Sequence, residues 1–261
     1  MNHFEKYESY IPFDLLIPGN FLVAFLCLTV IVIFRYFFLT MLFYVPFYKR
    51  QSYWSQKRQI YNKLPDHKAQ IFEIKWSLVS SGIFGISGVL LGVFWQLGWA
   101  EFYLSFDHYG WTYFFLSPFI LSILHDLYFY LTHRMLHTSW MYRRFHSVHH
   151  ASLEPSPWAS FSFHPVESII EALPIPLFSL ILPLHPVIIV IYLTMMTVSA
   201  IINHLGFEVM PLRLQRWLIS GTHHSSHHRN FKSNYGLFYT FWDRLFGTEY
   251  ESKKSPRPEF H

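Results

Sequence analysis

The sequence predicts an all-α membrane protein: a polytopic helical bundle of three transmembrane spans and a helical hairpin, with a cytoplasmic histidine-rich cap. Two observations predict this class. The composition is 52% hydrophobic and only 14% charged, which leaves too few charges to solvate an ordinary soluble domain. Several apolar runs also approach the roughly 20 residues that a helix needs to cross a bilayer.

The apolar runs give the order of the elements. Phe21 to Val45, Trp76 to Ala100 and Tyr109 to His125 predict three transmembrane helices, and the third continues without a helix breaker through His137. A fourth apolar region, Ile169 to Ile202, is divided by four prolines and predicts a helical hairpin or a re-entrant pair. The chain therefore divides into an N-terminal membrane region with two spans and a basic loop, residues 1–110, and a second region, residues 111–261, with every clustered histidine.

Charge predicts the orientation of the bundle. The loop from Lys49 to Lys75 has seven Lys and Arg residues, whereas the loop from Glu101 to His108 has none. Basic loops stay on the cytoplasmic side, so we expect a multi-pass protein with both histidine clusters on the cytoplasmic face, in the plasma membrane of a bacterium or the endoplasmic reticulum of a eukaryote. No basic patch interleaved with aromatic residues is present, so no nucleic-acid partner is expected. The sole cysteine, Cys27, excludes an internal disulfide.

Histidines are concentrated in two stretches, HRMLHTSWMYRRFHSVHH from His133 to His150 and THHSSHH from Thr222 to His228. Within them, spacings of three and four residues place imidazoles on shared helix faces. The eight candidate metal ligands are His133, His137, His146, His149, His150, His224, His227 and His228. A lone histidine near a membrane is usually an interfacial residue, but eight neutral imidazoles are enough to bind two metal ions and leave room for a substrate or oxidant.

Other ionisable residues give weaker signals. His164 in FHPVE and His204 in NHLGFE are isolated, and each is balanced between a metal ligand and an interfacial residue. Glu208 would lie one helical turn beyond His204, and His223 is one register off the spacing of the last cluster, so whether either contacts metal stays open. Asp126 lies inside the third span, where ionisable groups are costly and often functional.

The position of the histidines bears on their chemistry. Imidazole suits Zn, Cu, Fe or Ni, so ligand type alone leaves the metal open. Helices that emerge from the bilayer place the site where an acyl chain or a sterol can reach it. Attack on an unactivated C–H bond demands a strong oxidant, which two irons and dioxygen can supply. A zinc hydrolase would want fewer ligands, an open coordination position and a general base.

The motifs HRMLH, HSVHH and HSSHH, together with SFHPVE, NHLGFE and NYGLFYTFWDRLFGT, resemble the fatty acid hydroxylase superfamily, most closely its sterol desaturase branch. The resemblance extends from about Asp126 to Thr248. It implies that residues 111–261 form a catalytic domain with two non-haem Fe ions, which uses O2 to hydroxylate or desaturate a lipid, either sterol-like or fatty acyl. It also implies that the eight histidines bind metal, that His204 and His164 are further ligands, and that Asp126 supports the ligands from behind.

The closing signature of the resemblance is structural. Its matching residues are Asn234, Tyr235, Gly236, Trp242, Asp243 and Gly247. The extra His223 departs from the family pattern and puts the ligand set of the last cluster in doubt.

Electrons for such a reaction must come from outside the chain. The sequence has no glycine-rich dinucleotide fingerprint and no haem or iron–sulfur pattern, so the expected partner is a small cytochrome or ferredoxin with its NAD(P)H reductase. A membrane Zn or Cu transporter is the main alternative function. Transport would want ligands spread through the bilayer, whereas these clusters flank the spans on one side. Haem held by two histidines would not require eight.

Overall fold

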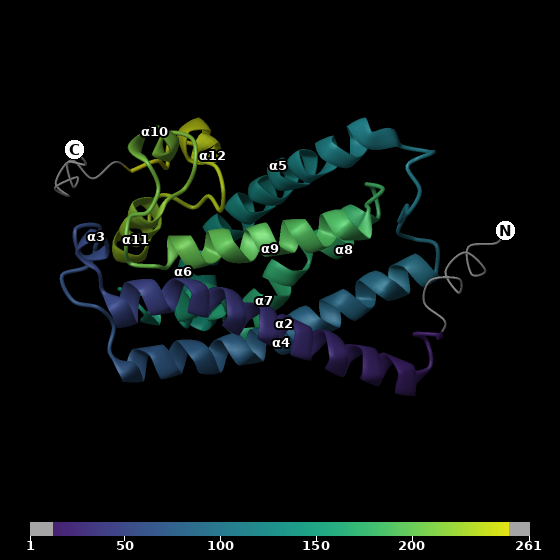
Figure 1. Cartoon of the computed structure of the whole chain (residues 1–261), viewed down its shortest axis with the longest axis horizontal. Coiled ribbons are helices and arrows are strands. Elements are labelled where there is room, and N and C mark those ends of the chain that lie inside the picture. The colour runs from purple at the N-terminus through teal and green to yellow at the C-terminus, as the bar shows by residue number, and fades with distance from the viewer. Residues whose placement is uncertain (1–12, 251–261) are drawn as a thin grey trace.

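The computed structural model describes residues 13–250, and this part of the chain is a bundle of helices without β-strands (Figure 1). Four helices are long and apolar enough to cross a membrane. They are α2 (Pro18–Tyr44), α4 (His67–Gln96), α5 (Gly110–Leu136) and α9 (Pro186–Asn203). The all-α membrane class expected from the apolar runs is therefore confirmed. Four short helices gather at one end of the bundle (Figure 1): α3 (Tyr53–Gln56), α10 (Leu212–Gln215), α11 (Gly221–Asn230) and α12 (Phe241–Leu245).

Helices α2 and α4 form a closely packed pair. Gly85 of α4 lies against Thr29 of α2, where an added Cβ would come within 2.2 Å of the Thr29 hydroxyl; small residues at a membrane helix crossing allow such close approach. Helix α4 begins at His67, nine residues before the expected span, because the Asp66 carboxylate accepts a hydrogen bond from the Ala69 N–H at 2.9 Å. Helix α2 continues into a π-helical turn, Val45–Arg50.

The predicted hairpin is present with unequal arms. The first arm is divided into α7 (Pro165–Ala172) and α8 (Pro174–Ser179), and the second is α9. Their connection lies against the loop before α5, because the Leu184 N–H donates to the Glu101 carbonyl at 3.0 Å. A proline has no N–H to donate and clashes with the preceding turn, which accounts for the broken first arm.

The cap is built from short helical pieces: α3 (Tyr53–Gln56), α6 (Ser139–Met141), α10 (Leu212–Gln215), α11 (Gly221–Asn230), α12 (Phe241–Leu245), the π-helical turn Tyr142–His146 and the 3₁₀ turns His149–Ala151 and Pro157–Phe161. The segment SWMYRRFHSVHH, whose histidine spacing predicts a shared helix face, is thus three short turns. This interruption matters for the site, because it changes the directions in which neighbouring histidines point.

One irregular segment passes between the spanning helices. The carbonyl of Trp158 accepts hydrogen bonds from the Tyr36 hydroxyl of α2 at 2.7 Å and the Ser77 hydroxyl of α4 at 2.9 Å. Trp158 and Phe161 also pack on the ring of Tyr36. Non-helical backbone at membrane depth is tolerated where protein covers it, and these contacts fix the segment that lies beneath the histidines.

Candidate metal centre

Nine histidines converge on two adjacent groups. Within each group, one ring nitrogen of every member lies within 4.8 Å of the others. The first group, called cluster 1, contains His133, His137, His146, His150 and His227; cluster 2 contains His149, His204, His224 and His228. The clusters adjoin, since the ring centroids of His150 and His228 are 4.5 Å apart. Eight of these nine residues are buried.

Each cluster draws its members from separate segments. His133 lies on α5 and His137 caps its C-terminal end, so this pair shares one helix face as the spacing predicts. His149 and His150 are sequence neighbours, but they belong to different clusters. In α11, His224 and His228 point into cluster 2 while His227 points into cluster 1. The sequence spacing therefore predicted the residues but not their partition.

Hydrogen bonds fix the orientation of most of these rings. His133, His146, His149, His204, His227 and His228 each donate from Nδ1 to an oxygen, namely Tyr235 O, Glu167 Oε1, Ser162 O, Ala200 O, Ser233 O and Ser152 O, over distances of 2.7–3.3 Å. A proton on Nδ1 leaves a lone pair on Nε2. Metal-binding histidines are commonly oriented in this way.

The Nε2 atoms face one another, but the rings carry too few Nε2–H groups to hydrogen-bond every facing pair. His137 Nε2 is 3.0 Å from His146 Nε2 and 3.1 Å from His227 Nε2; one proton on His137 could serve only one of these two lone pairs. In cluster 2, His149 Nε2 and His204 Nε2 lie 3.3 Å apart, although both rings carry their proton on Nδ1. Facing lone pairs repel, and a cation between them removes the repulsion, so both donor sets fit a metal ion.

Burial keeps these imidazoles neutral. Burial, and then the neighbouring imidazoles, lowers the pKa of His146, His149 and His224 well below the usual value for histidine. Burial also lowers the pKa of His204 to about 4. Only the neutral ring has a lone pair for a metal, so the clusters are ready to bind metal at physiological pH.

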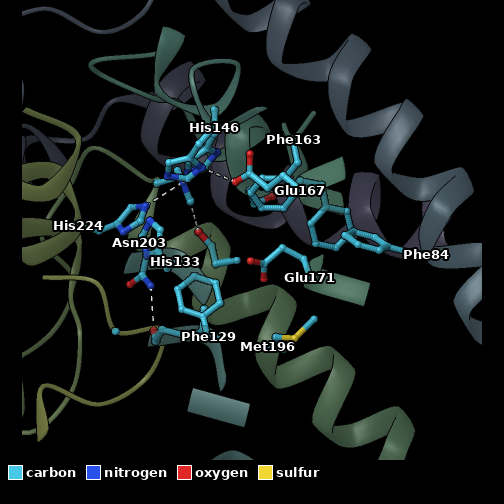
Figure 2. Close-up of a pocket in the computed structure, with 17 residues that line it drawn as sticks. Phe84, Phe129, His133, His146, Phe163, Glu167, Glu171, Met196, Asn203 and His224 are labelled. Carbon is cyan, nitrogen blue, oxygen red and sulfur yellow. Dashed lines mark hydrogen bonds and ion pairs between the residues drawn. The ribbon is translucent and has the colours of Figure 1, made fainter. Parts of the chain in front are cut away.

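Glu167 supports cluster 1 directly, a role that the sequence reading did not assign. Its Oε1 accepts the Nδ1–H of His146 at 2.7 Å, and both side chains are almost completely buried. Figure 2 shows the dashed contact between them. A carboxylate behind a histidine fixes the ring tautomer and makes Nε2 a better ligand. The signal was a glutamate in the first turn of α7, in the motif FHPVE.

Asp126 acts on the backbone of a loop rather than on a histidine side chain. Its carboxylate accepts hydrogen bonds from the N–H groups of Leu237, Phe238 and Tyr239 at 2.7–3.2 Å. The same loop offers the Tyr235 carbonyl to His133. The expected support for the ligands is thus indirect: Asp126 holds the loop, and the loop orients His133.

Asp243 holds the beginning of that loop. It accepts from the N–H groups of Tyr235 at 2.8 Å and Gly236 at 2.9 Å, and from the Thr248 hydroxyl at 2.7 Å. The closing signature NYGLFYTFWDRLFGT therefore folds around two buried carboxylates, Asp126 and Asp243.

Glu208 lies at the N-terminal end of α11, outside both clusters. Its Oε2 accepts hydrogen bonds from the Ser220 hydroxyl and from the N–H and hydroxyl of Thr222. Those bonds satisfy free donors at the helix start and place a negative charge where the helix dipole favours it. Ser220 also contacts His223 Nδ1 at 3.0 Å, and His223 belongs to neither cluster.

His164 is the one predicted ligand that the structure does not bring to a cluster. Its Nδ1 accepts the N–H of Val166 at 3.2 Å and so caps α7, and its ring lies beside Trp76 and Phe145. His204, which was equally weak in the sequence, belongs to cluster 2. Near the middle of α5, His125 hydrogen-bonds to Tyr192 of α9 at 3.0 Å, which joins these two spanning helices.

A narrow cavity runs from the clusters into the bundle (Figure 2). With its mouth it contains about 650 Å³ of space not filled by protein atoms. One end is lined by His133, His146, His149, His204 and His224. Phe129 of α5 lies beside His133, with ring centroids 5.0 Å apart, and Phe84 of α4 and Met196 of α9 line the cavity farther from the histidines. All three residues are on candidate transmembrane helices. The cavity thus connects the histidines with the membrane-spanning part of the protein.

The fold and the site together define the class of protein: a helical membrane protein with two histidine clusters that could hold metal ions, at one end of an apolar cavity. The family model described as fatty acid hydroxylase matches residues 118–248. The chain belongs to the fatty acid hydroxylase family.

Several curated relatives that resemble this sequence are sterol enzymes by name. The chain is 30% identical over 162 residues to the Delta(7)-sterol 5(6)-desaturase ERG3B of Gibberella zeae, an alignment that covers 62% of this chain and 49% of the relative. It is 32% identical over 178 residues to lathosterol oxidase of Homo sapiens, covering 67% and 60%, and 34% identical over 154 residues to ERG3 of Saccharomyces cerevisiae, covering 58% and 41%. The chain spans about half the length of the curated relatives it matches. No solved structure matches significantly.

Proposed function

We propose that this protein is an O2-dependent di-iron oxidoreductase that hydroxylates or desaturates a lipid C–H bond. The observation that carries the proposal is the convergence of nine imidazoles on two adjacent buried groups at the inner end of the cavity. The names of the relatives, sterol desaturases and a sterol oxidase, support the same class of reaction. Two irons with dioxygen would supply the oxidant that an unactivated C–H bond requires.

Each cluster would hold one metal ion. Cluster 1 offers five nitrogens and cluster 2 offers four, which leaves His164 out of the proposed ligand set. Six of the nine rings are locked by their Nδ1 hydrogen bonds, so metal binding needs little rearrangement. Imidazole ligands without thiolates suit iron as well as zinc or copper, and the resemblance of the histidine motifs to the sterol desaturase branch favours iron among them.

The chain's own residues orient the substrate and exclude water. Phe84, Phe129 and Met196 contact an apolar lipid body, while His133 and His224 lie at the inner end where the reactive carbon must be placed. The spanning helices that supply this wall give a lipid a route from the bilayer, so the substrate need not cross water. A sterol-like ring system and a fatty acyl chain both meet these demands.

The proposed orientation places the clusters on the cytoplasmic side. The basic loop from Lys49 to Lys75 lies at the same end of the bundle as the histidines, because α2 ends and α4 begins there. This face would meet a small cytochrome or ferredoxin and its NAD(P)H reductase, and its positive charge would attract an acidic donor. Whether the membrane is bacterial or endoplasmic reticulum depends on the source.

Metal analysis of the purified protein tests the proposal. We expect about two irons per chain and the Mössbauer signature of a coupled pair, and we expect His149→Ala to lose product formation while still inserting into the membrane. His108→Ala is the matched control, since His108 is exposed on the loop before α5. Zinc or copper in place of iron, with metal transport into proteoliposomes, would favour the transporter instead.

A further inference from the structure

Helix α4 carries a completely buried carboxylate that belongs to neither histidine cluster. This residue, Glu73, lies in the second turn of α4. Its Oε1 accepts the Ser156 N–H at 3.2 Å, its Oε2 accepts the Ser156 hydroxyl, and the Ser152 side chain adjoins the same carboxylate. A buried carboxylate is costly unless donors surround it, and the donors here come from the irregular segment that passes between the spanning helices.

That irregular segment, residues 152–162, orients two of the four rings of cluster 2. The carbonyl of Ser152 accepts the Nδ1–H of His228 at 3.0 Å, and the carbonyl of Ser162 accepts the Nδ1–H of His149 at 3.3 Å. Each bond leaves the Nε2 lone pair of its ring directed toward the other members of cluster 2. The position of segment 152–162 therefore determines where two of the four nitrogens lie.

The segment is stiff at the point where Glu73 holds it. Ser156 stands between Pro155 and Pro157, and the ring of each proline fixes its own φ. Two residues beyond Ser156, the Trp158 carbonyl is held by hydroxyl groups from α2 and α4. We therefore expect a displacement of Ser156 to move the neighbouring carbonyls instead of being absorbed by the backbone.

Cluster 1 takes its orientation from a different part of the chain. Its rings donate from Nδ1 to the carbonyls of residues 233 and 235 and to the Glu167 carboxylate. These acceptors lie within residues 118–248, which match the family model, whereas Glu73 lies outside this range. The two clusters thus differ in the elements that support them.

We propose that Glu73 is a positioning residue for the metal site: it holds segment 152–162 so that the Nε2 atoms of His149 and His228 point into cluster 2. The metal affinity of cluster 2 then depends on Glu73, and that of cluster 1 does not. This inference rests on the proposed function in that both clusters hold a metal ion. It gives the N-terminal membrane region, through α4, a part in building the metal site.

Titration of the full chain with Co2+ in detergent, after a chelator has removed the native metal, tests the inference without requiring turnover. Co2+ lies between Fe2+ and Ni2+ in its affinity for nitrogen ligands, and its visible absorption reports binding. Glu73→Leu removes both acceptor oxygens and should weaken the binding of one Co2+ ion roughly tenfold, as loss of a group behind a metal ligand does. Glu73→Gln keeps an acceptor for the Ser156 N–H and should retain most of the affinity. Wild-type affinity for both ions in Glu73→Leu would overturn the inference.

Histidine variants assign the weakened site. His150→Ala removes a member of cluster 1, and in this background Glu73→Leu should still weaken Co2+ binding at cluster 2. His149→Ala removes a member of cluster 2, and here Glu73→Leu should have little further effect on the ion that remains in cluster 1. Losses of similar size in the two backgrounds would indicate a general loosening of the fold and would overturn the positioning role.

A buried polar residue at the other end of α4 supplies the matched control. The Gln96 side chain accepts the Leu15 N–H at 2.9 Å, so Gln96→Leu also breaks a buried hydrogen bond of α4 but should leave both Co2+ affinities unchanged. Ser156→Ala removes only the hydroxyl donor and should weaken cluster 2 by a smaller factor than Glu73→Leu. If Glu73→Leu does not fold, unchanged Co2+ binding in Ser156→Ala would overturn the inference.

The iron content of the chain as purified separates this inference from the proposed function. About two irons per chain, with Co2+ affinities that do not respond to Glu73→Leu, would leave the oxidoreductase standing and remove the positioning role. A chain that purifies with zinc or copper, transports it, and shows a cluster 2 affinity that depends on Glu73 would keep the positioning role and remove the oxidoreductase.

Discussion

His149 and His150 are consecutive in the chain, yet their rings belong to different clusters and their centroids are 5.5 Å apart with the ring planes nearly perpendicular. The 3₁₀ turn His149–Ala151 produces this divergence. Two adjacent residues thus supply a ligand to each of the two proposed metal ions.

The divergence predicts selective loss of metal. His150→Ala should weaken binding at cluster 1, and His149→Ala should weaken binding at cluster 2, which has only four members and should be the more sensitive. Iron per chain, measured after dialysis against a mild chelator, should fall from about two toward one in each variant. Complete retention of both irons in His149→Ala would contradict the assignment of cluster 2.

Removal of the carboxylate behind His146 should loosen cluster 1. In Glu167→Ala the buried Nδ1–H of His146 loses its acceptor, and metal affinity should fall about 10–100-fold, as it does when such supporting groups are lost elsewhere. A chelator competition series would measure the change. Glu154→Ala is the control, because Glu154 pairs with Arg229 at the surface. An unchanged affinity in Glu167→Ala would show that the pair has no part in metal binding.

The cap of α11 should contribute to stability. Glu208→Ala removes the acceptor of bonds from Ser220 and Thr222, and the expected loss is about 1–3 kcal/mol of unfolding free energy. A lowered thermal midpoint of the purified protein in detergent would report it. Glu249→Ala, which breaks a partly exposed pair with Arg244, should cost less; equal losses in the two variants would argue against the capping role.

The turn at Gly206 should tolerate no side chain. Gly206 has φ +75°, and a Cβ there would lie 2.5 Å from the ring of Tyr61, whose hydroxyl accepts a hydrogen bond from Ser225 of α11. Gly206→Ala should therefore lower the thermal midpoint and the iron content together, because it displaces the helix that carries three ligands. Gly19→Ala is the control, since an added Cβ at Gly19 meets nothing within 4 Å. Wild-type values for Gly206→Ala would contradict this.

Local patterns in the sequence predicted the fold well, because lipid imposes long apolar helices that can be seen in the sequence directly. The ends of the helices were harder to predict. Helix α4 starts early because Asp66 caps it, and this cap follows a proline-containing loop in which other residues could also have started the helix. The break in SWMYRRFHSVHH was missed because a repeated spacing of histidines resembles a continuous helix face. Only the packing around the π-helical turn Tyr142–His146 decides against it.

The candidate site was predictable in composition but not in arrangement. The clustered histidines could be recognised from their spacing. The isolated residues His164 and His204 were equally weak candidates in the sequence, and only the packing of distant segments brings His204, but not His164, to a cluster. His204 meets His149 and His224, which are 55 and 20 residues away in the chain. The role of Glu167 could not be predicted, because only the fold brings it to His146, which is 21 residues away in the chain.

The mixed membership of the clusters has a mechanical consequence. Cluster 1 joins α5, the segment at residues 142–150 and α11, while cluster 2 joins that same segment, the end of α9 and α11. Metal ions bound at both clusters would cross-link these elements, so the helices could not separate at the histidine end of the bundle. Under the proposed function, a lipid substrate would therefore enter from the bilayer between the other ends of the helices, and its oxidised product would leave by the same route.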